Sequence, residues 1–333
     1  MGDPASIGPE ISVKALGAPG VYEICRPIII GDAGIMSMAL KSAGREDLRL
    51  LAVESAAEAG FAYGTIDVLD VGAVSAKDIT PGEISAATGD ASYRYVEKAV
   101  ELAMAGALDA TVTNAISKEA INLAGHRFAG HTEIYAKLTG TAKYSMMLAH
   151  GHIRVVHVST HVSLRQACDL VRRGRVLEVI KLADSACKAL GISRPVIAVA
   201  GLNPHSGEAG MFGTEEVDEI IPAIADACAA GIDAQGPVPP DTVFPKARGG
   251  LYDIVVAMYH DQGHIPLKLE GFVYDKAAQA MTSVEGVNIT LGLPIIRTSV
   301  DHGTAMDKAY QGTAGSQSLT HAIEYAARFA KGL

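Results

Sequence analysis

The stretch Ile254-Val255-Val256-Ala257-Met258-Tyr259-His260 begins as a short apolar, β-branched run and ends on a histidine. Two other stretches share this layout: residues 155–159 lead to His161, and residues 196–200 lead to His205. Apolar runs of this length and composition favour buried strands. Because ligands of open α/β sheets bind outside the carboxyl ends of the strands, the three histidines are expected to converge on one crevice.

Apolar runs and segments of helical period alternate along the chain, which is typical of an α/β protein with a mainly parallel sheet. The predicted strands are residues 26–30, 110–113, 144–148, 155–159, 196–200 and 254–258. The predicted helices are residues 9–16, 91–105, 163–173, 176–190, 215–230 and 316–329. Ser163 and Gln166 have the spacing of a capping box, and Gly106 and Gly231 stand where helices are expected to stop.

Composition and charge limit the function classes. The 333 residues are enough for two domains, and 49% hydrophobic with 20% charged residues is the composition of a soluble globular protein. The formal charge of −9 disfavours binding to nucleic acid or to an anionic membrane. The four cysteines form no Cys-x-x-Cys pair, and no signal sequence or membrane span is recognised, so a reduced, cytoplasmic chain is expected.

Three imidazoles at one sheet edge would suit a divalent transition metal with open positions for a substrate. The spacings of 44 and 55 residues between His161, His205 and His260 match no compact zinc motif. Histidine is also a common, partly buried hydrogen-bonding residue of loops. The alternative, that these are ordinary loop histidines, therefore stays open from the residues alone.

Other polar residues are candidates for binding an anion. The loop of residues 3–10 enters a helix and is either an anion-binding loop or a tight turn. Since it has no strand in front of it, the natural chain is expected to begin upstream of Met1. Lys118 follows the strand at residues 110–113, and His131 and Thr132 open a short helix, where Thr132 is alternatively only a cap. No Gly-x-Gly-x-x-Gly or P-loop sequence is present, so a nucleotide would be held in another way.

Several blocks of sequence, in order along almost the whole chain, match those of one known family. They are residues 2–5 (Gly-Asp-Pro-Ala), 130–133 (Gly-His-Thr-Glu), 201–205 (Gly-Leu-Asn-Pro-His), 257–262 (Ala-Met-Tyr-His-Asp-Gln), 287–294 and 297–305. Together they resemble the 4-hydroxythreonine-4-phosphate dehydrogenase family, including its branch that acts on 4-phospho-threonate or 4-phospho-erythronate. Residues 263–268 and 239–244 look closer to that branch.

The resemblance implies an isocitrate/isopropylmalate-dehydrogenase-like α/β fold of two α/β/α lobes with an active-site cleft between them. Residues 1–120 and 290–333 are expected to form the first lobe and to contribute to NAD binding. Residues 121–289 are expected to form the second lobe, with the metal and substrate ligands and the interface of a homodimer.

The resemblance also assigns roles to residues of this chain. His161 and His205 of one subunit and His260 of its partner would hold one divalent ion, Zn, Mg, Mn or Co. Substrate contacts fall on His131, Thr132, Lys268, Asn288 and Arg297. NAD, with NADP as the alternative, is expected at His302, Gly303 and Thr304. Lys118 and Asp261 are our candidates for proton transfer.

The predicted reaction is NAD-dependent oxidative decarboxylation of a 4-phosphorylated 3-hydroxy acid, with 4-hydroxythreonine 4-phosphate of pyridoxal phosphate biosynthesis as the first choice. The alternative is a 4-phospho-D-threonate or 4-phospho-D-erythronate dehydrogenase of sugar-acid catabolism. A dihydrodiol dehydrogenase, a metal-dependent aldolase or hydrolase without NAD, a phosphate acyltransferase and a non-catalytic binding protein are further alternatives.

The chain departs from the family's usual pattern at three places. Ser6 stands where the family often has Gly, and Ala115 where Pro is usual. Residues 272–286 form an insertion between Lys268 and Asn288. The insertion therefore lies between two of the expected substrate contacts.

Overall fold

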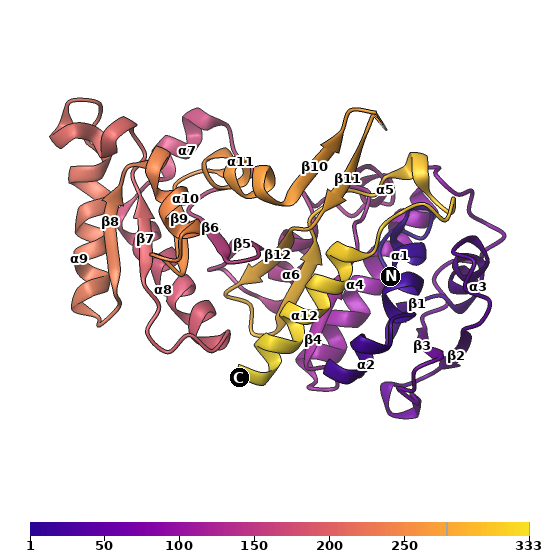
Figure 1. The fold of residues 1–333 in the computed structure, drawn as a ribbon. Coiled ribbons are helices and arrows are strands. Elements are labelled where there is room, and N and C mark those ends of the chain that lie inside the picture. Colours follow the sequence, from indigo (N-terminus) through magenta and orange to yellow (C-terminus); the bar gives the residue numbers. More distant parts are fainter. Residues whose placement is uncertain (278, 333) are drawn as a thin grey trace. The chain divides into compact units, whose positions relative to one another are not determined.

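The computed structural model describes residues 1–277 and 279–332, with only the backbone for Ala280–Val284. The chain divides into two compact units, each built from two segments (Figure 1). The first comprises Met1–Ala142 and Leu293–Ala327, and the second comprises Lys143–Gly292 and Arg328–Leu333. Residues 121–142 therefore group with the first unit rather than with the predicted second lobe, because the helices in this segment pack against a long helix of the first unit.

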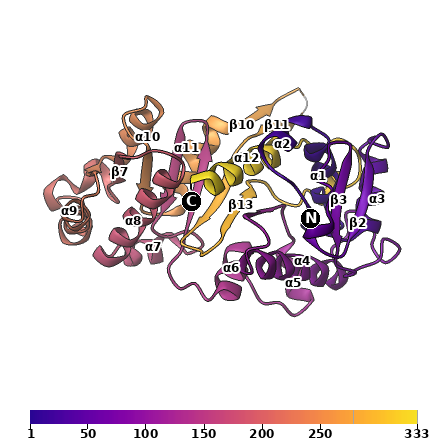
Figure 2. The ribbon, with the colours of Figure 1, turned by 90° about the horizontal axis from the view of Figure 1, so that it is seen from below.

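One part of the first unit is a parallel sheet in the order β1-β3-β2, formed by β1 (Ile29–Gly31), β3 (Thr65–Asp70) and β2 (Arg49–Val53). It packs with α1 (Gly8–Leu16), α3 (Ala33–Ser42) and α12 (Gln317–Gly332) around a core that includes Ile11, Met36, Ile66, Leu319 and Ile323. Two short helices, α2 (Pro19–Ile24) and η1 (Ala56–Glu58), lie in its connections. Figure 2 shows α1, α3 and this small sheet side by side.

The other part of the first unit is the parallel pair β4 (Ala110–Thr113) and β13 (Ile296–Val300) with three helices. These are α4 (Ala86–Met104), α5 (Lys118–Leu123) and α6 (His131–Thr139). Their core contains Val96, Val100, Ile121, Ile134 and Tyr135. A short helical turn, η4 (Met306–Lys308), follows β13.

The second unit contains a sheet in the order β12-β5-β6-β9-β7-β8. Its strands are β12 (Val287–Leu291), β5 (Ser145–His150), β6 (Ile153–His157), β9 (Ile254–Ala257), β7 (Ile197–Ala200) and β8 (Ala234–Val238). From β6 to β8 the pairs are parallel, whereas β5 is antiparallel to both β6 and β12. The mainly parallel prediction is wrong for β5, because Gly151 and His152 turn the chain directly into β6 as a hairpin.

Helices cover both faces of this sheet (Figure 1). On one face, α10 (Pro240–Arg248) and α11 (His260–Gly271) contribute Phe244 and Leu267 to a core with Val155 and Val255. Neighbouring strand residues point to the other face, where α8 (Arg173–Ala189) packs on the strands and α9 (Ile221–Ala229) packs on α8. The remaining short helical elements of this unit are α7 (Leu164–Leu170), η2 (Pro204–Gly210) and the π-helical η3 (Glu216–Ile220).

The six predicted strands and six predicted helices are all present, with ends shifted by a few residues. The capping box at Ser163 and Gln166 is confirmed, and Gly106 and Gly231 follow helix ends with φ of 73° and 83°. The insertion forms a hairpin of β10 (Phe272–Asp275) and β11 (Ala280–Val284), whose residue 278 lies outside the described residues. Each of the four cysteines is a free thiol. Within the described chain, no helix combines the length and the apolarity that a membrane crossing requires.

A single glycine permits the close approach of α4 and α5. A Cβ at Gly89 would overlap the backbone carbonyl of Ala120. We expect Gly89→Ala to destabilise the protein by about 3 kcal/mol, because overpacking forces the helices apart. Gly20 in α2 has open space around it among the described atoms, so Gly20→Ala is the matched control and should cost nothing. Urea unfolding of the two variants tests this; equal midpoints would contradict it.

Candidate active site

The three predicted metal ligands follow three neighbouring strands. Strands β6, β9 and β7 are adjacent and parallel, so their carboxyl ends lie at the same edge of the sheet. His161 comes after β6, His260 begins α11 after β9, and His205 lies in η2 after β7. The strand-edge placement expected from the sequence is therefore present in the second unit.

The rings of His161 and His260 lie near each other, whereas the ring of His205 has a different neighbour. The centroids of the His161 and His260 rings are 6.1 Å apart. The ring of His205 instead lies 6.3 Å from that of Phe212. Over the described part of one chain, no group of three or more His, Cys, Asp or Glu side chains is close enough to hold a metal ion. Within one chain, the described structure therefore does not bring the three histidines into one metal site.

The chemistry of the donors nevertheless fits a divalent metal. His260 pairs through Nδ1 with Asp261 Oδ1 at 2.6 Å. Metal-ligating histidines commonly use one ring nitrogen in this way, because it fixes the tautomer and leaves the other nitrogen for the metal. Asp261, our candidate for proton transfer, is therefore placed as the partner of His260.

Two further histidines, which the sequence analysis did not single out, lie beside His260. His264 stacks on it with centroids 3.5 Å apart, and His157 lies 4.7 Å from His264. Burial lowers the pKa of His157 to about 4 and that of His264 to about 3, so both are neutral at neutral pH. The signal in the sequence was the spacing of four between residues 260 and 264, which places two side chains on one helix face.

In the first unit, Arg297 on β13 is a buried cation, only 3% exposed. Its Nη2 donates to the hydroxyl of Thr113 at 2.7 Å, and its guanidinium lies 5.6 Å from the ring centre of Tyr135. Burial lowers the pKa of Arg297 to about 10, and Tyr135 and Glu133 oppose this shift. Arg297 therefore keeps its charge at neutral pH.

The start of α6 lies in the same region. Its N-cap is Gly130, and no side chain of the described residues caps it, so the reading of Thr132 as the cap is wrong. The buried Nε2 of His131 has no hydrogen-bond partner among the described residues. A Cβ at Gly130 would lie 3.8 Å from Cε of Lys118, so the lysine stem passes beside this helix start. The structure thus brings Lys118, His131, Thr132 and Arg297 together.

The other two predicted substrate contacts belong to the second unit. Lys268 on α11 is half-buried, with Nζ 5.4 Å from the ring centre of Phe272. Asn288 lies on β12, and its buried Oδ1 meets no donor in the described part of the chain. Their roles as substrate ligands stay predictions.

The predicted cofactor stretch offers one open hydrogen-bonding atom. Nδ1 of His302 pairs with the carbonyl of Gly303 at 2.8 Å, while its buried Nε2 has no partner within the described residues. Burial lowers the pKa of His302, so its ring is neutral. Thr304 accepts a hydrogen bond from the N–H of Ile7 at 3.2 Å. An unpartnered buried nitrogen is a feature that a bound cofactor would satisfy.

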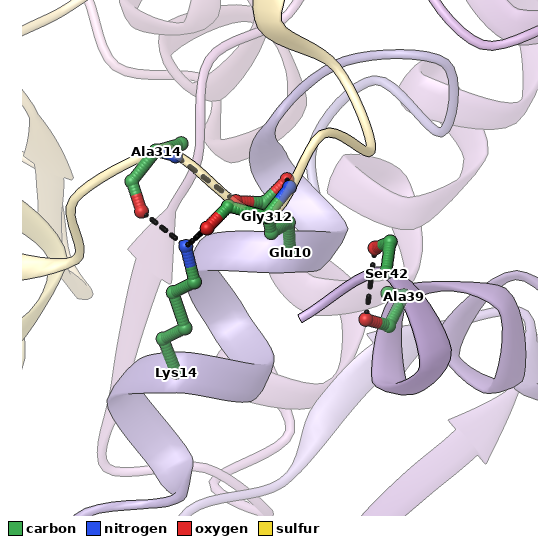
Figure 3. A network of polar contacts seen from close by, with 6 residues as sticks. All are labelled: Glu10, Lys14, Ala39, Ser42, Gly312 and Ala314. Atoms are coloured by element: carbon green, nitrogen blue, oxygen red, sulfur yellow. Dashed lines mark hydrogen bonds and ion pairs between the residues drawn. The ribbon is translucent and has the colours of Figure 1, made fainter. Parts of the chain in front are cut away.

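The N-terminal segment anchors the chain that follows this stretch (Figure 3). The buried carboxylate of Glu10 accepts hydrogen bonds from the N–H groups of Gly312 and Ala314 and pairs with Lys14 at 2.7 Å. Lys14 in turn donates to the carbonyl groups of Gly312 and Ala314. Within residues 3–10, the carboxylate of Asp3 accepts the N–H of Ala5, as in a tight turn. The contacts therefore favour the structural reading of that loop.

The isolated Nε2 of His131 has a consequence for its titration. Burial, and then the charge of Arg297, lower the pKa of His131 well below 6.5. We expect its NMR signal, assigned with His131→Asn, to stay unchanged from about pH 8 to about pH 5. Because the unfolded chain binds this proton near pH 6.5 and the folded chain does not, stability should fall as the pH drops below that value. A midpoint near pH 6.5 in the folded protein would contradict the prediction.

Known proteins resemble this chain along its whole length. Residues 23–326 match the family described as pyridoxal phosphate biosynthetic protein PdxA. A D-threonate 4-phosphate dehydrogenase of Salmonella typhimurium is 48% identical over 330 residues, which cover 99% of this chain and 97% of that protein. A 4-hydroxythreonine-4-phosphate dehydrogenase of Desulforapulum autotrophicum is 46% identical, covering 98% of this chain and 93% of that one.

The fold is shared as well. The crystal structure of a 4-hydroxythreonine-4-phosphate dehydrogenase from Klebsiella pneumoniae superposes with a TM-score of 0.87 at 44% identity, over 99% of this chain and 98% of that one. The α/β fold class expected from the resemblance, that of the isocitrate/isopropylmalate dehydrogenases, is therefore confirmed. On these grounds the chain belongs to the pyridoxal phosphate biosynthetic protein PdxA family.

Proposed function

We propose that this protein is an NAD- and metal-dependent dehydrogenase that oxidises and decarboxylates a 4-phosphorylated 3-hydroxy acid. One observation carries the proposal beyond family membership: His161, His260 and His205 follow the carboxyl ends of three adjacent parallel strands. Three imidazole ligands suit a divalent transition metal that keeps positions open for substrate.

A phosphate-binding role for the first unit rests on charge. The buried guanidinium of Arg297, the unpartnered Nε2 of His131 and the start of α6 offer positive charge and hydrogen-bond donors in a chain of net charge −9. Arg binds phosphate through a planar fork of donors, and helix starts favour anions. Lys268 and Asn288 are proposed as substrate contacts of the second unit.

Between the two named substrates we favour D-threonate 4-phosphate over the first choice made from the sequence. The Salmonella relative bears that name at 48% identity, and further relatives at 43–46% identity share it. The two substrates differ at C2, where threonate carries a hydroxyl and 4-hydroxythreonine carries an ammonium group. 4-Hydroxythreonine 4-phosphate stays as the second candidate, because a relative of 46% identity bears that name.

A homodimer is proposed because one chain does not gather its three histidines. Exposed apolar side chains accompany each of them: Val162 and Leu164 after His161, Met211 and Phe212 after His205, and Ile265 and Leu269 on α11 after His260. Exposed apolar groups of this kind mark protein interfaces. A second copy covering them would supply the missing ligand, as the resemblance implies for the partner's His260.

When bound, NAD supplies the hydride acceptor, and a divalent cation supplies a Lewis acid for the alcohol oxygen. His161, His205 and His260 would hold the cation, with Asp261 fixing the tautomer of His260. His302, Gly303 and Thr304 would hold NAD, with Nε2 of His302 as a hydrogen-bonding atom.

The proposed reaction has two steps, oxidation of the alcohol and then loss of CO₂. The alcohol carbon loses a hydride to NAD⁺ and the oxygen loses a proton to a base, which gives NADH and a β-keto acid. The bond to the carboxylate then breaks, CO₂ leaves, and a proton adds to the remaining carbon. We propose that Lys118 moves one of these protons, since its stem passes the start of α6.

The substrate proposal predicts NADH formation from D-threonate 4-phosphate with equimolar release of CO₂. Unphosphorylated D-threonate should lose about a thousandfold in kcat/KM, because the charged hydrogen bonds to the phosphate are missing. The absorbance of NADH is measured across a panel that also holds 4-hydroxythreonine 4-phosphate, 4-phospho-D-erythronate and a cis-dihydrodiol. Turnover of the dihydrodiol alone would refute the phosphate role, and no NADH with any substrate would favour an enzyme class without NAD.

The metal proposal predicts that His161→Ala, His205→Ala and His260→Ala each lose bound metal and turnover while remaining folded. His152→Ala is the matched control, because His152 lies exposed in the turn between β5 and β6 and is no proposed ligand. Elemental analysis, circular dichroism and turnover are measured together. A ligand variant that keeps full metal content and activity would remove its histidine from the site.

A further inference from the structure

His205 lies on a strained turn. Five consecutive residues have left-handed backbone, with φ of 53° at His205, 55° at Ser206, 79° at Gly207, 43° at Glu208 and 54° at Ala209. For residues other than glycine this conformation costs roughly 1–2 kcal/mol each. Such strain persists only where surrounding contacts enforce it, and it concentrates at functional sites. Neighbouring residues must therefore hold this turn in place.

Glu216 provides the first support. It is 1% exposed, and its Oε1 accepts the N–H groups of Leu202 and Asn203, both at 2.7 Å. Its Oε2 accepts the side-chain amide of Asn203 at 2.9 Å. A Cβ on Gly207 would lie 2.7 Å from Oε2, and one on Gly201 would lie 3.1 Å from Oε1. The carboxylate thus fills the space between the end of β7 and the left-handed turn.

The backbone around Glu216 is itself unusual. Glu216 begins the π-helical turn η3, and the helix α9 that follows has Pro222 at its start. Proline has no N–H to donate, and π-helical turns occur frequently at functional sites. This wide turn is the element that presents the carboxylate.

Gln262 provides the second support, from the opposite side. Its Nε2 donates to the carbonyl of Gly201 at 2.8 Å, and its Oε1 accepts the N–H of Met258 at 2.6 Å. The hydroxyl of Ser159 donates to the carbonyl of Met258 at 3.2 Å. These bonds link the end of β7 to that of β9, and the end of β9 to that of β6. They therefore connect the strand ends that lead to all three candidate ligands.

The segment of residues 201–203 is thus held on both sides immediately before His205. We propose that Glu216 and Gln262 are positioning residues that hold His205 in place for metal ligation. The inference rests on the proposed metal site and adds two residues that are not among its proposed metal or substrate ligands. Groups that hydrogen-bond a metal ligand commonly change metal affinity ten- to hundredfold when they are removed, and we expect the loss of backbone support just before His205 to act in the same direction.

The test is a Co²⁺ titration of the full-length, metal-free protein. Glu216→Gln keeps the size of the side chain but removes its charge. It also places an NH₂ group where Oε2 accepts a hydrogen bond from the side-chain amide of Asn203, so that two donors face each other. Gln262→Met removes both hydrogen bonds of Gln262 and is the second variant in case the first does not fold. Asp218→Asn is the control, since Asp218 lies exposed on the same π-helical turn. In both variants we expect the Kd for Co²⁺ to rise roughly ten- to hundredfold and the visible absorption spectrum of the bound Co²⁺ to change. The control variant should show neither change.

Thermal unfolding without metal separates positioning from stability. A lowered melting temperature with an unchanged Co²⁺ Kd and spectrum would show a purely structural role and overturn the inference. An unchanged Kd in both folded variants would do the same. A wild-type protein that binds no Co²⁺ would instead refute the proposed metal site, and the inference with it. Failure of the metal site can therefore be distinguished from failure of the positioning role alone.

Discussion

Parallel pairing of β6, β9 and β7 is the constraint on which the candidate metal site depends. Val155 pairs with Val255, and Ile254 pairs with Ile197, so the three strands run in the same direction and end at one edge. All the residues of these strands are buried, because helices cover both faces of the sheet. The three candidate ligands, His161, His260 and His205, lie just beyond the ends of these buried strands.

In the first unit, burial lowers the pKa values of two neighbouring basic groups, Arg297 and His131. Arg297 lies on β13, where residues 297–300 are buried, and the hydroxyl of Thr113 replaces part of the hydration of its guanidinium. His131 is neutral beside it, since burial and the guanidinium charge disfavour a second positive charge. A ligand that brings negative charge would meet an arginine already oriented by Thr113. An acidic chain can in this way bind an anion through local charge.

The turn at His205 shows how a strained backbone is maintained. The segment directly before it, residues 201–203, is held by hydrogen bonds to the carboxylate of Glu216 and to the side-chain amide of Gln262, both of which belong to other elements. The sequence block at residues 201–205 identifies the histidine, but not its support, because Glu216 and Gln262 are distant from it along the chain. Backbone strain and its compensation are visible only when those elements are brought together.

The amino-acid sequence by itself determined the α/β class, the six apolar strands, the capping box at Ser163 and the candidate ligands, because periodicity, capping and strand-end placement are local properties. The sequence also indicated the family, because blocks spread along the chain match those of its members. The antiparallel direction of β5, the hairpin at the insertion, the grouping of residues 121–142 with the first unit and the contact of Arg297 with Thr113 were decided by tertiary structure. Those features depend on which strands and helices become neighbours, and that choice is made by packing between segments as far apart as residues 113 and 297, for which no local pattern exists.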